Sequence, residues 1–285
     1  MKLSNRVLEM EESVTLAASA RAAALKAEGR DILSLTLGEP DFTTPENIQK
    51  AAIAAIQDGK ASFYTAASGL PALKDAISSY METFYGYAVP RNQVVVATGA
   101  KFILYAAFAT LLNPGDEVII PTPCWVSYVD QVKMVDAVPV TFQTTEANDF
   151  KATVEQLEAA RTEKTKLILL NSPSNPTGMI YSREELEAIG AWALEHDILI
   201  LADDIYGRLV YNGHEFTAIS SLSDALRKQT IVVNGVSKTY AMTGWRVGFA
   251  VAEPEIIAGM AKIISQTTSN LTAVSQYAAI EALTG

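Results

Sequence analysis

The stretch Ile231-Val-Val-Asn-Gly-Val-Ser-Lys-Thr-Tyr-Ala-Met-Thr-Gly-Trp-Arg-Val-Gly248 decides the fold. It opens with a short apolar, β-branched run over 231–233 that shows no polar alternation and stops at Asn234-Gly235, which predicts a buried strand. Lys238 follows just beyond the C-terminal end of that strand. In open α/β sheets, ligands bind in the crevice outside those strand ends. The sequence therefore places a lysine where such proteins usually do their chemistry.

Two interpretations of Lys238 are open. A solvated surface lysine is the simpler one, but such a lysine usually has acidic neighbours. The neighbours here are hydroxyl, apolar and aromatic side chains, and the next charge along the chain is Arg246. An amine in such surroundings beside another cation has a lowered pKa, which makes it a nucleophile toward carbonyl carbons. We therefore favour a reactive amine.

The composition is that of a globular protein with a large core, with 285 residues of which 49% are apolar and 19% charged. The formal net charge of −10 argues against nucleic acid or an anionic membrane as a partner, and solubility explains it most simply. Cys124 is the only cysteine, which excludes an intrachain disulfide and suits a reducing compartment. The sequence has no run of about 18 apolar residues and no apolar leader, so we expect a cytoplasmic protein. His196 and His214 are too few for a histidine-based metal site, and no metal is expected.

From about residue 93, short apolar strands alternate with helices. Strands are predicted over 94–97, 118–120, 138–142, 167–170 and 198–201. Apolar strands of this length between helices indicate a mostly parallel sheet covered on both faces, which is a three-layer α/β fold. Before this region the sequence predicts a helix over 13–28 and a brief strand over 32–35, which together suggest an N-terminal arm.

Two loops after predicted strands are candidates for ligand contacts. Thr98-Gly99-Ala100-Lys101 joins a strand to a helix through a glycine, which leaves free N–H groups at the positive end of a helix and favours an anion such as phosphate. An ordinary βα turn explains this feature equally well. Asn171-Ser-Pro-Ser-Asn-Pro-Thr-Gly178 holds Asn175 as an amide donor, although a plain rigid loop is the simpler interpretation.

Asp203 follows the wholly apolar run 198–202, so its carboxylate should lie at the floor of the crevice. A buried carboxylate needs a cation or must take up a proton. The cation is either a lysine or arginine of the chain or a protonated ring nitrogen of a bound cofactor. Tyr206 comes three residues later, close enough to reach the same crevice. Trp125 could stack on a flat ring, although a lone tryptophan is more often part of the core.

These signals are weak one by one, but all of them fall at the C-terminal ends of predicted strands. A reactive lysine, a buried aspartate, a phosphate site with a nearby arginine, an aromatic ring and a phenol are the groups that one cofactor requires. Pyridoxal 5′-phosphate is held as a Schiff base on a lysine, with an aspartate on its pyridine nitrogen. We therefore predict a pyridoxal-phosphate site.

Four motifs resemble the class I/II pyridoxal-phosphate aminotransferases, and most closely the bacterial aspartate aminotransferases. They are Gly38-Glu-Pro-Asp-Phe42, Asn171-Ser-Pro-Ser-Asn-Pro-Thr-Gly178, Ala202-Asp-Asp-Ile-Tyr206 and Ser237-Lys-Thr-Tyr-Ala-Met-Thr-Gly-Trp-Arg246, in the family's order. The resemblance implies that Lys238 binds the cofactor covalently and moves a proton at the substrate Cα. It implies that Asp203 keeps the pyridine nitrogen protonated. Tyr206 and Asn175 would bond the phenolic oxygen of the ring.

The resemblance also assigns contacts around the cofactor and implies a homodimer with a shared active site. The turn Gly99-Ala100-Lys101, together with Ser237 and Arg246, would grip the phosphate. Trp125 would cover the ring face, Gly38 would line the α-carboxylate of the substrate, and Tyr64 would reach the phosphate of the neighbouring subunit.

The expected reaction is transfer of the amino group of an L-amino acid, aspartate, to 2-oxoglutarate. Lys101 could pair with a side-chain carboxylate, with Ser13 on the arm as a helper, and Trp125 and Asn175 would also contact the substrate. The simpler interpretation is that Lys101 only solvates the first turn of its helix. A C–S lyase or another amino-acid aminotransferase is the alternative, because the fold and the cofactor residues do not choose the reaction.

Two features depart from the family's pattern. The usual Asp-Glu-Ile-Tyr is here Asp203-Asp204-Ile205-Tyr206, with little effect expected. The expected domains are an arm with part of a small domain over 1–44, a cofactor-binding large domain over 45–272, and the start of an interdomain helix over 273–285. The family's C-terminal small domain, which carries an arginine for the α-carboxylate, is expected to be missing. The chain would then be a fragment of a longer protein or a truncated form that is impaired in catalysis or non-catalytic.

Overall fold

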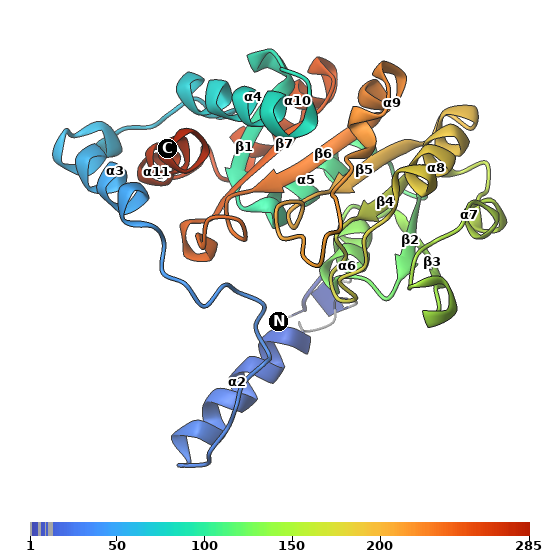
Figure 1. The fold of residues 1–285 in the computed structure, drawn as a ribbon, viewed down its shortest axis with the longest axis horizontal. Coiled ribbons are helices and arrows are strands. Elements are labelled where there is room, and N and C mark those ends of the chain that lie inside the picture. The colour runs from blue at the N-terminus through green and yellow to red at the C-terminus, as the bar shows by residue number, and fades with distance from the viewer. Residues whose placement is uncertain (1, 5–6, 9, 11–13) are drawn as a thin grey trace.

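A seven-stranded sheet forms the centre of the protein (Figure 1). The structure is a computed structural model that describes residues 2–4, 7–8, 10 and 14–285. The strands are β1 (Val94–Thr98), β2 (Glu117–Thr122), β3 (Val138–Gln143), β4 (Thr165–Asn171), β5 (Leu199–Asp203), β6 (Thr230–Gly235) and β7 (Val247–Val251). They lie in the order β1-β7-β6-β5-β4-β2-β3. β7 is antiparallel to both of its neighbours, and the other pairs are parallel. The mostly parallel α/β sheet predicted from the sequence is confirmed.

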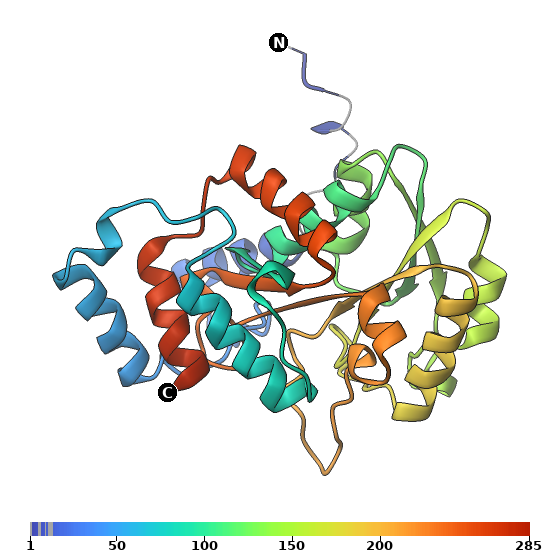
Figure 2. The ribbon, with the colours of Figure 1, turned by 90° about the horizontal axis from the view of Figure 1, so that it is seen from above.

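Helices cover both faces of this sheet. The helices of this body are α3 (Glu46–Gln57), α4 (Pro71–Tyr85), α5 (Ala100–Leu111), α6 (Ser127–Met134), α7 (Val154–Ala160), α8 (Arg183–Glu195), α9 (Asp224–Gln229), α10 (Pro254–Thr267) and α11 (Ala273–Thr284). Of these, α3 packs mainly against α11. Seen from above, α5, α6 and α10 lie on one side of the sheet and α4, α8 and α9 on the other (Figure 2). A further helix, α2 (Val14–Ala27), projects away from this body (Figure 1).

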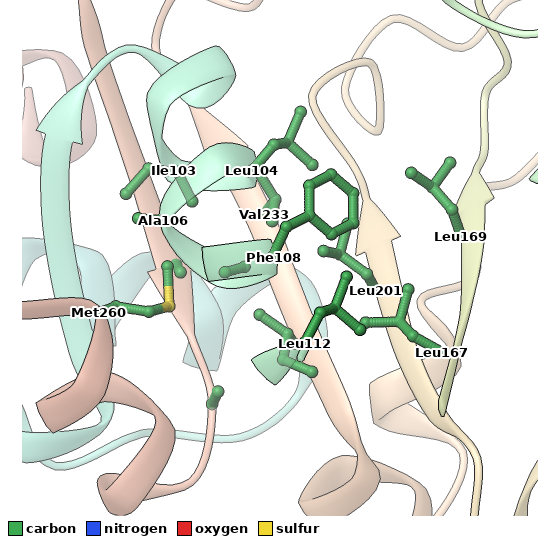
Figure 3. Close-up of a cluster of buried hydrophobic side chains, with 14 of the residues drawn as sticks. Ile103, Leu104, Ala106, Phe108, Leu112, Leu167, Leu169, Leu201, Val233 and Met260 are labelled. Carbon is green, nitrogen blue, oxygen red and sulfur yellow. The ribbon is translucent and has the colours of Figure 1, made fainter. Parts of the chain in front are cut away.

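Alternation along the strands produces the layers, because successive side chains of a strand point to opposite faces. In β4, Leu167 and Leu169 join the core beneath α5, whereas Ile168 and Leu170 join the core beneath α8. Figure 3 shows the first of these cores, with Phe108 of α5 above the strands. Parallel strands buried on both faces read as unbroken apolar runs, which is why the sequence located them.

Local sequence signals fix several helix ends. α8 starts with a capping box, in which Ser182 accepts from the N–H of Glu185 and the Glu185 side chain accepts from the N–H of Ser182. α4 begins at Pro71 and ends at Tyr85, and it is capped by Gly86, which adopts a left-handed conformation with φ of 79°.

The strand predicted over 32–35 is wrong. The structure shows no regular element there, and the side chains of Leu33 and Leu35 are 89% and 88% exposed. A strand needs a neighbour to accept its backbone hydrogen bonds, and no other described segment pairs with this one.

None of the helices in the described part of the chain is both long enough and apolar enough to cross a bilayer.

Candidate active site

The predicted site residues gather at the C-terminal edge of the central strands. Asn171 at the end of β4 pairs in register with Asp203 at the end of β5, and Asp203 pairs with Val233 of β6. Parallel strands present their carboxyl ends at one edge of a sheet, so residues far apart in the chain become neighbours there. Lys238 lies three residues beyond Gly235, the last residue of β6.

Asp203 is a buried carboxylate with neutral partners. It is 3% exposed, and its Oδ2 accepts a hydrogen bond from the hydroxyl of Tyr128 (2.7 Å). Its Oδ1 accepts from the backbone N–H of Ile205 (3.3 Å). Within the described residues, it forms no ion pair with a lysine, arginine or histidine. Burial raises the pKa of Asp203 to about 6, and the two hydrogen bonds oppose that rise. A cationic ligand would complete this site.

Tyr128 is a site residue that the sequence analysis missed. It lies in α6, one helical turn after Trp125, and the two rings meet edge to face with centroids 5.3 Å apart. The sequence could have indicated Tyr128, because residues three apart at the start of a helix share a face and Trp125 was already a candidate. Trp125 and Asp203 are therefore linked through one phenol.

Asn171 connects the proline-containing loop to the end of β5. Its Nδ2 donates to the carbonyl of Asp203 (2.8 Å), and its Oδ1 accepts from the N–H of Asn175 (2.7 Å). Asn175 Nδ2 in turn lies 3.4 Å from the hydroxyl of Tyr206. The structure thus brings the predicted Asn175 and Tyr206 together. It adds Asn171, to which the sequence analysis gave no role.

Lys238 is half-buried on the same edge. Its Nζ donates to the carbonyl of Gly38 (2.5 Å) and lies 5.9 Å from the centre of the Tyr206 ring. Burial lowers the pKa of Lys238; Glu39 opposes that shift, and Arg246 adds to it. In the described part of the chain, its amine has no carboxylate within ion-pair distance.

The loop that carries Gly38 is held against the lysine segment by side-chain contacts. Thr243 Oγ1 donates to a carboxylate oxygen of Glu39 (3.0 Å). Thr44 Oγ1 donates to the carbonyl of Ala241 (2.7 Å) and accepts from Nε1 of Trp245 (2.9 Å). Segments about 200 residues apart in sequence are therefore fixed side by side.

A cradle for an anion lies at the start of α5. Gly99 has φ of 81°, and a Cβ at this position would collide with the guanidinium of Arg246, so only glycine fits. Arg246 donates from Nη1 to the carbonyl of Thr243 (2.9 Å), which holds its guanidinium beside the turn. Ala100 begins the helix, and Ser237 is buried in the neighbouring loop. Backbone N–H groups at a helix N-terminus together with a guanidinium form a suitable phosphate site.

Lys101 extends from the same turn toward Trp125. Its Nζ lies 4.8 Å from the centre of that ring, a cation–π contact. Its backbone carbonyl accepts from Nε2 of Gln131 (2.8 Å). Burial lowers the pKa of Lys101, and Arg246 adds to the shift. The Lys101 side chain is exposed and lies beside the Trp125 ring.

Two predicted residues are not part of this cluster. Tyr64 is 92% exposed and has no hydrogen bond to the residues above in the described structure. Ser13 lies outside the described residues.

The residues present fit pyridoxal phosphate. The buried carboxylate of Asp203 has no cationic partner among the described residues, the amine of Lys238 has a lowered pKa, and a turn at Gly99 with an arginine beside it suits a phosphate. These three features follow β5, β6 and β1, whose C-terminal ends lie at one edge of the sheet, as a cofactor with a ring nitrogen, an aldehyde and a phosphate requires.

Asp203 makes a pH-dependent contribution to stability that can be measured without the cofactor. In the unfolded chain this carboxyl has its ordinary pKa of 3.8, whereas burial in the folded chain raises the pKa to about 6. The folded state binds more protons over this range, so the free energy of unfolding falls as the pH rises from about 4 to 6 and then levels off. We expect this contribution to be about 2 to 3 kcal/mol.

Urea unfolding of the cofactor-free protein and of Asp203→Asn at pH 4 and pH 7 measures this contribution. The advantage of the native protein over the variant should shrink between the two pH values. A constant difference would contradict a raised pKa for this carboxyl.

Comparison with known proteins agrees with this geometry. The family model "Aminotransferase class I and II" matches residues 30–285. An asparagine–oxo-acid transaminase of Streptococcus mutans is 74% identical, over 100% of this chain and 72% of the relative. An aspartate aminotransferase of Bacillus subtilis is 48% identical, with the same two coverages.

Solved structures give the same result. The aspartate aminotransferase of Rhizobium meliloti superposes with a TM-score of 0.96 at 44% identity, covering 100% of this chain and 71% of that one. The aspartate aminotransferase of Thermus thermophilus with maleate also has a TM-score of 0.96, at 39% identity, and covers 100% and 73%. The chain therefore belongs to the class I and II aminotransferases, which are pyridoxal-phosphate-dependent enzymes.

Proposed function

We propose that this aminotransferase takes its amino group from aspartate or from its amide asparagine and passes it to 2-oxoglutarate. The proposal rests on the positions of Lys238 and Asp203 at the ends of the adjacent strands β6 and β5. The lysine amine has a lowered pKa, and the buried carboxylate has no cationic partner among the described residues. The names of the relatives support aspartate and asparagine as donors.

When bound, pyridoxal phosphate supplies an electron sink that stabilises negative charge at the substrate Cα. Asp203 would hold a proton on the ring nitrogen, and Tyr128 keeps the Asp203 carboxylate oriented. Asn175 and Tyr206 would donate hydrogen bonds to the ring oxygen. Trp125, whose own ring is held by Tyr128 and Lys101, would cover one face of the ring and exclude water.

Lys238 would hold the cofactor and then move a proton to and from the substrate Cα. A general base works best when its pKa lies near the working pH, and burial lowers the pKa of Lys238 in that direction. The cradle formed by Gly99, Ala100, Ser237 and Arg246 would grip the phosphate and so fix the ring relative to this amine. Gly38, whose carbonyl accepts from Lys238, would line the α-carboxylate.

The proposed donor is tested by following the absorbance of the purified, cofactor-loaded protein. Aspartate alone should convert the bound cofactor to its aminated form, and 2-oxoglutarate should then restore the original spectrum. Asparagine is tested in the same way. Release of pyruvate from cystathionine without any aminated cofactor would favour a C–S lyase instead. A yellow protein that gives no half-reaction with any amino acid would favour a non-catalytic chain.

Lys101 is proposed to bind the side-chain carboxylate of aspartate. Lys101→Met keeps the length of the side chain and removes the charge, so the KM for aspartate should rise about tenfold or more. The KM for alanine, which has no side-chain carboxylate, should stay near its original value. An equal rise for both substrates would assign Lys101 to the phosphate turn alone.

The proposal also includes the oligomeric state, the location and the domain division of the protein. We propose a homodimer in which the exposed Tyr64 contacts the phosphate bound by the second subunit, and a cytoplasmic location consistent with a single free cysteine. We further propose the division into an arm with part of a small domain over 1–44, a large domain over 45–272 and an interdomain helix from 273. Gel filtration tests the dimer, and exchange of Tyr64→Phe subunits with Lys238→Ala subunits tests the shared site.

A further inference from the structure

A buried chain of hydrogen bonds joins the ends of β5 and β6. Tyr85, the last residue of α4, donates its hydroxyl proton to Oδ2 of Asp204 (3.0 Å) and accepts from Nδ2 of Asn234 (3.1 Å). Oδ1 of Asn234 accepts from the N–H of Gly235 (2.7 Å). The side chains of Tyr85, Asn234 and Asp204 are all at most 5% exposed. One phenol from a helix therefore ties the two strand ends together.

The two tied ends are the ones that carry the proposed catalytic pair. Asp204 directly follows Asp203, and its N–H donates to the carbonyl of Val233 (2.9 Å). Asn234 comes four residues before Lys238. Lys238 and Asp203 share no hydrogen bond in the described structure, so the scaffold around them must set their separation.

The adjacent acids point to opposite faces of the sheet, as alternation along a strand requires. Asp203 accepts from Tyr128 of α6 on one face, and Asp204 accepts from Tyr85 of α4 on the other. Burial, with Asp203 adding to the shift, raises the pKa of Asp204 well above its usual range, against the hydrogen bond from Tyr85. Asp204 therefore lies on the Tyr85 face of the sheet, and Asp203 lies on the Tyr128 face, where the cofactor ring is proposed to bind.

We propose that Tyr85 is a positioning residue that holds Lys238 and Asp203 at the separation the cofactor ring requires, an inference that rests on the proposed function. Hydrogen bonds that point in one direction along a chain strengthen one another in a buried setting. Here they run from Gly235 through Asn234 and Tyr85 to Asp204. A change of about 1 Å in the position of reacting groups can cost up to roughly a hundredfold in rate. The hydrogen bonds of Tyr85 can therefore affect the rate although Tyr85 lies away from the reacting atoms.

Tyr85→Phe removes only the hydroxyl, and Tyr87→Phe is a matched control. Tyr87 is also buried, donates to Oγ of Ser220 (2.8 Å), and its ring lies 6.2 Å from that of Tyr85 without reaching the strand ends. In protein loaded with pyridoxal phosphate, Tyr85→Phe should shift the pH midpoint of the visible absorbance of the bound cofactor. It should lower kcat with aspartate roughly tenfold while the KM changes little. Tyr87→Phe should keep the original midpoint and kcat.

Asn234→Ala breaks the same chain of hydrogen bonds from the side of β6, and it is the variant to test if Tyr85→Phe does not fold. The double variant should be no slower than the worse single variant, because each change removes the same tie. Additive losses of kcat would overturn the inference, as would a Tyr87→Phe variant that behaves like Tyr85→Phe.

The outcome can be separated from that of the proposed function. If borohydride still fixes a pyridoxyl group in Lys238→Ala, the proposed function fails and the inference fails with it. If Lys238 passes that test while Tyr85→Phe keeps the original midpoint and kcat, only the positioning role is overturned.

Discussion

Lys238→Ala is expected to lose the pyridoxyl group that borohydride otherwise fixes to the protein, and to lose nearly all transamination. In the proposed function, the amine at this position would both hold the cofactor and move a proton at the substrate Cα, so we expect no other group to replace it. Proton transfer by a positioned side chain alone contributes about 10²- to 10⁴-fold to a rate, and the loss should be at least that large. Peptide mapping after reduction locates the label, and half-reaction kinetics measure the rate.

Lys133→Ala is the control for this prediction. Lys133 lies on the exposed side of α6, so the variant loses the same charge without touching the crevice. It should keep the label on Lys238 and the full rate. If the pyridoxyl label stayed on the protein in Lys238→Ala, a residue other than Lys238 would hold the cofactor.

Asp203→Asn is expected to bind the cofactor but to react feebly. The amide keeps the shape of the side chain and removes the negative charge that would hold the ring nitrogen protonated. A neutral pyridine withdraws electrons less well, and the loss of one electrostatic group of this kind typically costs roughly 10²- to 10³-fold in kcat. Cofactor content is measured by absorbance and kcat by the half-reaction with aspartate.

Two variants define the origin of this effect. Tyr128→Phe removes the hydrogen bond that lowers the pKa of Asp203, so this carboxyl should hold a proton more readily and kcat should fall by less than in Asp203→Asn. Asp197→Asn removes a charge at the opposite, exposed end of β5, and it should leave kcat unchanged. If Asp203→Asn were as active as Asp197→Asn, Asp203 would have no role in the mechanism.

The sequence predicted the central fold well because the strands are buried on both faces. The runs at 94–97, 167–170 and 198–201 became β1, β4 and β5 with only small changes at their ends. The segment at 32–35 was misjudged, because an apolar run becomes a strand only where a partner lies beside it, and none does among the described residues. β7 was also missed as a separate antiparallel strand, since its pairing with β1 and β6 depends on contacts that are distant in the chain.

The residues of the candidate site could be predicted where a polar residue or a glycine directly follows an apolar strand in the sequence. Lys238, Asp203 and the turn at Gly99 each follow an apolar run, and the rule that ligands bind at strand ends located all three. Tyr128 and Asn171 were not found, because their roles come from hydrogen bonds to Asp203 across the sheet. The Tyr85 tie was invisible for the same reason, since it joins residues 119 and 149 positions apart.

By itself, the sequence determined the layered α/β fold, the family and the pyridoxal-phosphate chemistry, because apolar periodicity and short motifs are local properties of the chain. Only the tertiary structure decided which side chains surround Asp203 and Lys238, that no cation in the described part of the chain pairs with Asp203, and that Asp203 and Asp204 face opposite layers. Burial and hydrogen bonding depend on the elements that pack around a residue. Those two factors shift the pKa of each group from its ordinary value and fix the orientation of its side chain.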